Sequence, residues 1–299
     1  MLPRAMVLAA CTIALGGCSE ALPQPDHANL AYAAVSPAQK LDLYLPQGKG
    51  PFPLVINIHG GGFMMGDKNM LDAPIAEALL AKGIAVASID YRLSGEAQFP
   101  AAIEDAKAAV RFLRANAAKY RLNPDKFMVF GQSAGGNLAS LLGTTGNADV
   151  FDNPALGNAG VSSSVVAVID WFGPSDFSQM DNQARQQRCP PDHDAADSPE
   201  SKYLGAPIKT VPEKVKAANP ISYIDSGDPP FLLQKGSEDC MVPVRQSRML
   251  ADALRRGRVP VTFEMLEGAG HGDMGLWQPI FLSKTNVERV VSFAEQHLR

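Results

Sequence analysis

Short apolar runs alternate with stretches of helical periodicity along most of the chain. The runs are continuous and rich in β-branched residues, which is typical of parallel strands buried on both faces. They predict strands at residues 54–58, 84–89, 127–130, 165–169, 231–234 and 261–266. Apolar residues spaced by three and four predict helices at residues 73–82, 101–118, 134–142, 244–256 and 285–297. This order predicts an α/β fold, a mostly parallel, doubly wound sheet flanked by helices, with a ligand crevice at the carboxyl ends of its strands.

Two segments depart from this rhythm. Residues 31–35 and 41–45 precede the first buried run, and the alternating Leu-Asp-Leu-Tyr-Leu of the second predicts a hairpin at the sheet edge. Residues 171–228 are rich in Pro, Asp, Ser and Gln, with weak helical periodicity. We interpret them as an insertion before the penultimate strand that overhangs the crevice, because long insertions in compact domains usually have a functional or covering role.

The first 17 residues have the pattern of an export signal. Arg4 supplies a positive start, and residues 5–15 are apolar but too short to span a bilayer. Gly16 and Gly17 provide small residues at a cleavage point. We therefore expect residues 1–17 to be a signal peptide and the domain to begin at about residue 31.

The end of this signal resembles the lipobox of bacterial lipoproteins, in the sequence Leu-Gly-Gly-Cys at residues 15–18. The resemblance implies lipidation of Cys18, with Ser19 favouring the outer over the inner membrane of the cell envelope. An ordinary cleaved signal followed by an incidental cysteine is the alternative. Residues 18–30, with two prolines and no apolar period, are expected to be a tether.

Composition narrows the classes of function. The 27 Lys and Arg against 31 Asp and Glu give a formal net charge of −4, with no basic block, so we expect no nucleic-acid partner. Nowhere are there 18 consecutive apolar residues, which excludes a multi-span membrane protein. A membrane contact is therefore expected only through a lipid on Cys18.

Cys11 and Cys18 belong to the signal and its lipobox, which leaves Cys189 and Cys240. In an exported, oxidising compartment they can form one disulfide. Two free, buried thiols are the alternative, because sequence does not show whether their Cα atoms come within reach. A bridge would join the insertion to the loop that follows the strand at 231–234.

The sequence Gly-Gln-Ser-Ala-Gly at residues 131–135 lies between a predicted strand and a predicted helix. Glycines on both sides of a serine in this context indicate a strained turn that projects the hydroxyl above the sheet. The helix that follows favours developing negative charge at its N-terminus. Ser133 is therefore our candidate nucleophile.

A serine hydroxyl needs a neighbouring base. His271, in Gly-Ala-Gly-His-Gly directly after the last predicted strand, follows the serine in chain order and is the candidate. We expect His27, His193 and His297 to be solvated, because they fall in the tether, the insertion and a C-terminal helix.

The imidazole in turn needs an acid that fixes its tautomer. Asp239 follows the strand at 231–234 and completes the order Ser, Asp, His that this topology imposes. Glu238 is the nearest rival, and Asp176 is a second.

A glycine-rich loop, His-Gly-Gly-Gly-Phe at residues 59–63, follows the first buried strand. Its glycines let backbone N–H groups turn toward an oxyanion, together with the N–H of Ala134. We interpret His59 as a residue that holds this loop by hydrogen bonding. A phosphate-binding loop is excluded, since no Lys-Ser/Thr follows the glycines.

Together these motifs resemble the α/β-hydrolase superfamily. More narrowly, they resemble the bacterial feruloyl-esterase-like group within the carboxylesterase and hormone-sensitive-lipase-like enzymes. The resemblance covers about residues 41–298 and rests on residues 59–67 (HGGGFMMGD), 90–93 (DYRL), 99–100 (FP), 104–105 (ED), 131–135 and 268–272.

The resemblance implies an oxyanion hole formed by Gly61, Gly62 and Ala134. It also implies scaffold roles for Asp90, Arg92 and Asp105, and a group-specific insertion around residues 198–208. The chain departs from the group at Gln-Lys-Gly, residues 234–236, where relatives often have a histidine before the glycine.

We therefore expect an exported serine carboxylesterase that acts on short-chain, acetyl or feruloyl esters through an acyl-enzyme, with no metal or organic cofactor. Its partner would be a small or polysaccharide-borne ester. An amidase or peptidase of the same superfamily is one alternative, and a catalytically silent binding module is another.

Overall fold

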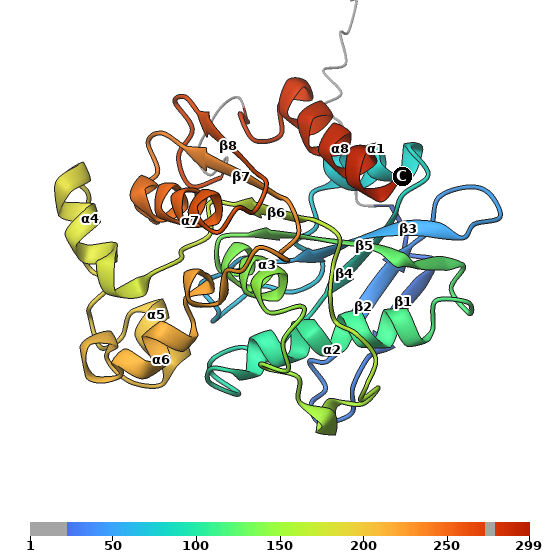
Figure 1. The fold of residues 1–299 in the computed structure, drawn as a ribbon, viewed down its shortest axis with the longest axis horizontal. Helices are drawn as coiled ribbons and strands as arrows, with labels where there is room; N and C mark the ends of the chain where they lie inside the picture. Colours follow the sequence, from blue (N-terminus) through green and yellow to red (C-terminus); the bar gives the residue numbers. More distant parts are fainter. Residues whose placement is uncertain (1–22, 273–278) are drawn as a thin grey trace, which may run out of the picture.

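The computed structural model describes residues 23–272 and 279–299, and eight strands in them form one sheet (Figure 1). The strands are β1 (His27–Ala31), β2 (Lys40–Tyr44), β3 (Phe52–Ile58), β4 (Ala85–Ile89), β5 (Leu122–Gln132), β6 (Val168–Trp171), β7 (Phe231–Gly236) and β8 (Val261–Leu266). Their order is β1-β2-β4-β3-β5-β6-β7-β8. Only the pairs β1–β2 and β2–β4 among these are antiparallel, which confirms the expected mostly parallel sheet.

Helices cover both faces of the sheet. The main ones are α1 (Ala73–Ala81), α2 (Ala101–Ala115), α3 (Ala134–Thr144), α7 (Val244–Arg256) and α8 (Lys284–Leu298). Strand β5 shows why two cores form, because its side chains alternate between the faces. Phe127 and Val129 join the core that contains residues of α2, α3 and α7, whereas Met128 and Phe130 join the core that contains residues of α1 and α8. Figure 1 shows α1 and α8 together on one side.

The N-terminal edge differs from the prediction. Residues 27–30, expected in the tether, belong to β1, and residues 32–39, expected to form a strand in part, are a loop. The side chain of Gln39 closes this loop by accepting hydrogen bonds from the N–H groups of Val35 and Ser36 at 2.9 and 3.0 Å. Strand β1 lies at an edge with mostly exposed side chains, so it is held by backbone pairing and carries little hydrophobic pattern.

The predicted insertion lies between β6 and β7, before the penultimate strand, as expected. Its first expected residue, Trp171, is instead the last residue of β6, where it pairs with Gln234 of β7. The insertion forms three short helices, α4 (Met180–Gln187), α5 (Pro199–Leu204) and α6 (Pro212–Ala217). In Figure 1 they lie together at the end of the molecule opposite the β1–β2 edge.

The parallel strands bring the candidate residues to one edge of the sheet. His59 follows β3, Ser133 follows β5, Asp239 lies three residues beyond β7, and His271 lies five residues beyond β8. Because parallel strands end at the same edge, four loops far apart in sequence meet there. Within the described part of the chain, no helix is both long and apolar enough to cross a membrane.

Candidate active site

Ser133 occupies a strained turn between β5 and α3. Its φ of 54° and ψ of −120° lie in a region that non-glycine residues rarely adopt, and its N–H donates to the carbonyl of Trp171 at 2.9 Å. A Cβ on Gly131 would lie 2.0 Å from the carbonyl oxygen of Gly135, and one on Gly135 would lie 2.1 Å from that of Ile58. The two glycines thus let the turn pack closely enough to hold this strained serine.

Ser133, His271 and Asp239 form a hydrogen-bonded chain. Nε2 of His271 lies 2.8 Å from Oγ of Ser133, and Nδ1 lies 2.8 Å from Oδ2 of Asp239. A carboxylate can only accept, so Nδ1 carries the hydrogen, and in the neutral ring Nε2 offers its lone pair to the serine hydroxyl. In this arrangement, His271 can take the proton of Ser133 as the oxygen attacks.

Asp239 is fully buried and accepts four hydrogen bonds. Oδ1 accepts from the N–H groups of Met241 and Val242, each at 2.9 Å. Oδ2 accepts from His271 and, at 2.6 Å, from the ammonium of Lys235. Burial alone would raise the pKa of Asp239, but the charge of Lys235 and the hydrogen bond from His271 outweigh it and lower the pKa to about 2. The carboxylate is therefore ionised and rigidly placed.

Neither rival acid reaches the imidazole. Glu238 is exposed, and Asp176 caps a turn by accepting from the N–H and hydroxyl of Ser178. The ring of Phe172, which follows β6, packs against His271 with the ring centroids 4.6 Å apart. This contact limits how far the imidazole can swing away from Ser133.

The glycine-rich loop lies beside the serine. Gly61 and Gly62 have φ of 106° and 59°, and a Cβ on Gly61 would lie 2.1 Å from the carbonyl oxygen of Met65, so the position of Gly61 requires glycine. His59 stacks on Tyr91 at a centroid distance of 4.3 Å, and its Nδ1 donates to the carbonyl of Gly60. Burial lowers the pKa of His59, which favours the neutral ring that holds this loop.

Two cavities have Ser133 in their lining. The first, of about 670 Å³, contains Ser133, His271, Gly61 and Gly62. Its walls are mostly apolar, and they include Met64, Met65, Met70, Trp171, Phe172, Met241, Phe281 and Leu282. The second, of about 760 Å³, contains Ser133, Gly62 and Ala134 and is bounded by residues of the 190–200 segment of the insertion. Because Ser133 lines both, a substrate bound at the serine can extend into either cavity.

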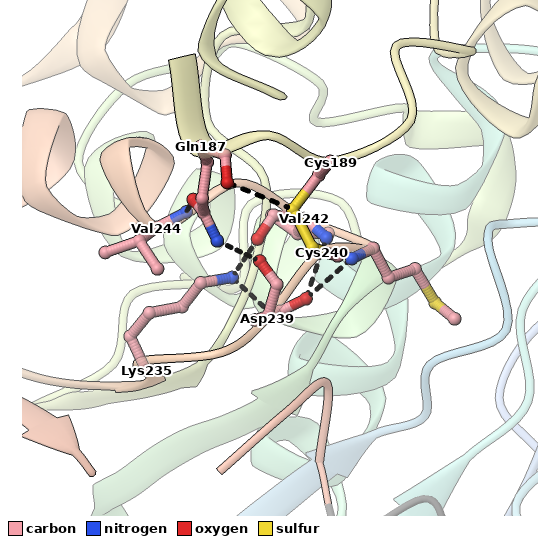
Figure 2. The surroundings of a disulfide bond; sticks show 8 residues. Gln187, Cys189, Lys235, Asp239, Cys240, Val242 and Val244 are labelled. Atoms are coloured by element: carbon pink, nitrogen blue, oxygen red, sulfur yellow. Dashed lines mark hydrogen bonds and ion pairs between the residues drawn. A yellow bond between two sulfur atoms is a disulfide. The ribbon is translucent and has the colours of Figure 1, made fainter. Parts of the chain in front are cut away.

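The insertion is attached to the loop that carries Asp239. Cys189 and Cys240 form a disulfide with a Cα–Cα distance of 5.2 Å (Figure 2). Gln187, at the end of α4, adds two hydrogen bonds, from its Nε2 to the carbonyl of Asp239 at 2.7 Å and from the N–H of Val244 to its Oε1 at 2.9 Å. The wall of the second cavity is thus fixed directly to the acid of the triad.

His193 differs from its prediction. It is only 6% exposed, and its Nδ1 lies 3.2 Å from Oε1 of Glu200 on α5. Burial lowers the pKa of His193, but the hydrogen bond and charge of Glu200 outweigh it, so the pKa is raised overall. The imidazole is therefore a buried partner of Glu200 inside the insertion. His27, also expected to be solvated in a tether, lies on β1 with its ring against Tyr120.

The residues with implied scaffold roles make the following contacts, none of which involves Ser133. Arg92 forms a bidentate ion pair with Asp105, which is fully buried. The side chain of Asp90 accepts a hydrogen bond from the N–H of Lys68 at 2.6 Å. Gln132 donates to Asp72 and lines the first cavity.

Some of the predictions fall outside the described residues. The signal peptide and Cys18 lie within residues 1–22.

Among residues 23–272 and 279–299, no group of three or more His, Cys, Asp or Glu is arranged to hold a metal ion.

Sequence reasoning assigned no role to Lys235, although Nζ of this residue contacts the triad acid. The sequence Gln-Lys-Gly at residues 234–236, where relatives often have a histidine before the glycine, was the one feature that could have drawn attention to Lys235. It indicates a role only once the structure shows the lysine buried beside Asp239.

Comparison with known families identifies the chain. The model of the BD-FAE family matches residues 41–254, more than half of the sequence. The chain belongs to the BD-FAE family. The BD-FAE match includes the glycine-rich loop, Ser133 and Asp239, and it ends before β8 and His271.

Individual relatives of this BD-FAE chain are esterases. Esterase LipC of Mycobacterium tuberculosis is 33% identical over 239 residues, which cover 79% of this chain and 57% of LipC. The chain thus spans little more than half the length of this relative.

A solved structure described as a truncated carbohydrate esterase from gut microbiota superposes with a TM-score of 0.82 at 32% identity, covering 93% of this chain and 98% of that one. A bifunctional GH43-CE protein of Bacteroides eggerthii superposes with a TM-score of 0.82 at 34% identity, covering 91% of this chain and 35% of that one. These similarities confirm the α/β-hydrolase fold.

Proposed function

We propose that this BD-FAE chain hydrolyses carboxylic esters with Ser133 as the nucleophile. The observation that carries the proposal is the chain of two 2.8 Å hydrogen bonds from Ser133, which lines two cavities, through His271 to the ionised Asp239. The esterase names of the relatives support the same chemistry.

The positions of Ser133, His271 and Asp239 support the following reaction. Oγ of Ser133 attacks the ester carbon as its proton passes to Nε2 of His271, and we propose that the N–H groups of Gly61, Gly62 and Ala134 stabilise the oxyanion. His271 then gives this proton to the leaving alcohol, which leaves an acyl group on Ser133. A water molecule attacks the acyl-enzyme and transfers its proton to His271. The acid departs, and the proton returns to Ser133.

We propose short-chain acyl esters, including acetyl and feruloyl esters borne on carbohydrate, as the substrate class. The mostly apolar first cavity suits an alkyl or aromatic group. The second cavity is lined by Asp192, His193, Asp197 and Glu200, which suits a hydroxylated group. The carbohydrate-esterase structure supports this assignment.

We further propose that the chain is exported and held at the bacterial cell envelope by a lipid on Cys18. The support is the sequence pattern of residues 1–18.

A substrate panel tests the proposed specificity. It contains p-nitrophenyl acetate, butyrate and octanoate, acetylated and feruloylated oligosaccharides, and p-nitroacetanilide. We expect kcat/KM to decline from acetate or butyrate to octanoate, release from at least one oligosaccharide ester, and negligible turnover of the anilide. Anilide turnover equal to that of the esters would favour an amidase. No turnover of any compound would favour a silent binding module.

A further inference from the structure

Lys235 is a fully buried lysine in contact with the triad. It lies near the end of β7, and its side chain is 0% exposed. Its ammonium donates to Oδ2 of Asp239 at 2.6 Å and to the carbonyl of Val242 at 2.6 Å (Figure 2). Burying an ammonium is costly unless its partners are well placed, so this contact is a specific feature of the chain.

The position of the contact matters because Lys235 and His271 share one oxygen. Both donate to Oδ2, while Oδ1 is held by two backbone N–H groups. A cation on the shared oxygen offsets part of the negative charge that Asp239 presents to His271. Asp239 therefore stabilises the protonated form of His271 less than a carboxylate without a lysine partner would.

Asp170 is the second carboxylate whose charge acts on Lys235, and its hydrogen bonds are made to other groups. Burial lowers the pKa of Lys235, and the charges of Asp239 and of Asp170 on β6 oppose that change. Asp170 is itself buried, and it accepts hydrogen bonds from the hydroxyl of Ser140 and the N–H of Gly173. Asp239 is therefore the carboxylate that couples Lys235 directly to His271.

We propose that Lys235 is a positioning residue of the triad, which holds Asp239 through Oδ2 and keeps His271 neutral and competent as a base at more acidic pH. The effect of Lys235 on rate rests on the proposed ester hydrolysis. The effect of Lys235 on the protonation of His271 is independent of any substrate.

The test compares neutral replacements of Lys235 with a matched control. Lys235→Met removes the charge and the donor, and Lys235→Gln removes the charge but keeps a donor. Lys107→Met is the control, because Lys107 is also 0% exposed, paired with an aspartate (Asp152) at 3.0 Å and bonded to backbone carbonyls, on α2.

Two readouts are collected on the full chain. The first is the pH profile of kcat/KM for p-nitrophenyl acetate. The second is the titration of His271, followed by NMR of protein with ¹⁵N-labelled histidine and assigned with His271→Ala. We expect both Lys235 variants to move the acid limb of the profile and the His271 midpoint upward by about one pH unit. Lys107→Met should leave both unchanged.

Three outcomes would overturn the proposal: folded Lys235 variants that titrate like the parent, the same shift in Lys107→Met, or loss of folded protein in both Lys235 variants while Lys107→Met folds. The last would show a structural role. If the parent hydrolyses no ester, the proposed function fails, while the NMR titration still decides on Lys235.

Discussion

At the scale of single residues, the site depends on positions where only one residue type fits. Ser133 sits at φ 54°, and the turn packs so closely that a Cβ at Gly131 or Gly135 would meet a carbonyl oxygen at 2.0 or 2.1 Å. The carbonyls belong to the backbone, so they cannot move aside as the tip of a side chain can. The reactive geometry and the stability of the turn are therefore coupled.

Gly135→Ala should destabilise the fold by about 3 kcal/mol, because overpacking against backbone forces neighbouring segments apart. Gly95→Ala is the control, since a Cβ there would meet nothing within 4 Å. Urea unfolding followed by circular dichroism measures both variants. Equal midpoints for the two would show that the turn can relax, contrary to the close packing described.

Some residues of the site could be identified from the sequence alone, and others could not. Ser133 and His271 were identifiable because glycines and strand ends mark them locally. Asp239 could not be separated from its neighbour Glu238 by chain order, because both lie between Ser133 and His271, and the structure separates them by burial. Lys235 and His193 were missed because a buried charge depends on partners elsewhere in the fold, and no local pattern distinguishes it from a solvated one.

At the scale of elements, the insertion between β6 and β7 is fixed to the site at two places. The Cys189–Cys240 disulfide and Gln187 attach it to the loop that carries Asp239, called the acid loop below, and the His193–Glu200 pair closes it internally. Its helices were poorly predicted because they are only six to eight residues long, too short to show a period. Ser198 as N-cap, with Pro199 after it, was an available start signal for α5.

Reduction of the disulfide should loosen the acid loop before it unfolds the sheet. The bridge joins residues 51 apart, a loop whose closure stabilises by about 4 kcal/mol in the chain-entropy model. We expect Cys189→Ser to lower kcat/KM several-fold at 25 °C with an unchanged far-ultraviolet spectrum. A non-reducing peptide map should contain Cys189 linked to Cys240. Two free thiols in that map would contradict the bridge.

The His193–Glu200 pair should make the stability of the insertion depend on pH. The pKa of His193 is raised in the folded state, so the pair stabilises fully below about pH 6.5, the unfolded value, and this contribution is lost as pH rises through the folded value. We expect the parent to lose about 2 °C more in Tm than His193→Gln between pH 6 and 9. Parallel Tm curves for the two proteins would argue against a charged pair.

At the scale of the whole molecule, the sheet determines where chemistry can occur. Parallel β3, β5, β6, β7 and β8 end at one edge, so loops as distant as residues 59 and 271 converge there. This arrangement was predictable from the alternation of strands and helices. The β1–β2 edge was less so, because an exposed edge strand such as His27–Ala31 lacks an apolar face.

The cellular location of the protein, proposed from residues 1–18, also concerns the whole chain. If Cys18 carries a lipid, Cys18→Ser should move the protein from the membrane pellet to the soluble fraction of a bacterial host and abolish labelling by a radioactive fatty acid. Cys11→Ser, within the same segment, is the control and should change neither result. Equal partitioning of Cys18→Ser and the parent would exclude an anchor at this cysteine.

The most direct test of the central claim is the rate of p-nitrophenyl acetate hydrolysis by Ser133→Ala. The control is Ser162→Ala, which removes the hydroxyl of an exposed serine. We predict that Ser133→Ala loses kcat by roughly 10³-fold or more while Ser162→Ala matches the parent. Retention of the parent rate by folded Ser133→Ala would contradict the assignment of Ser133 as the nucleophile.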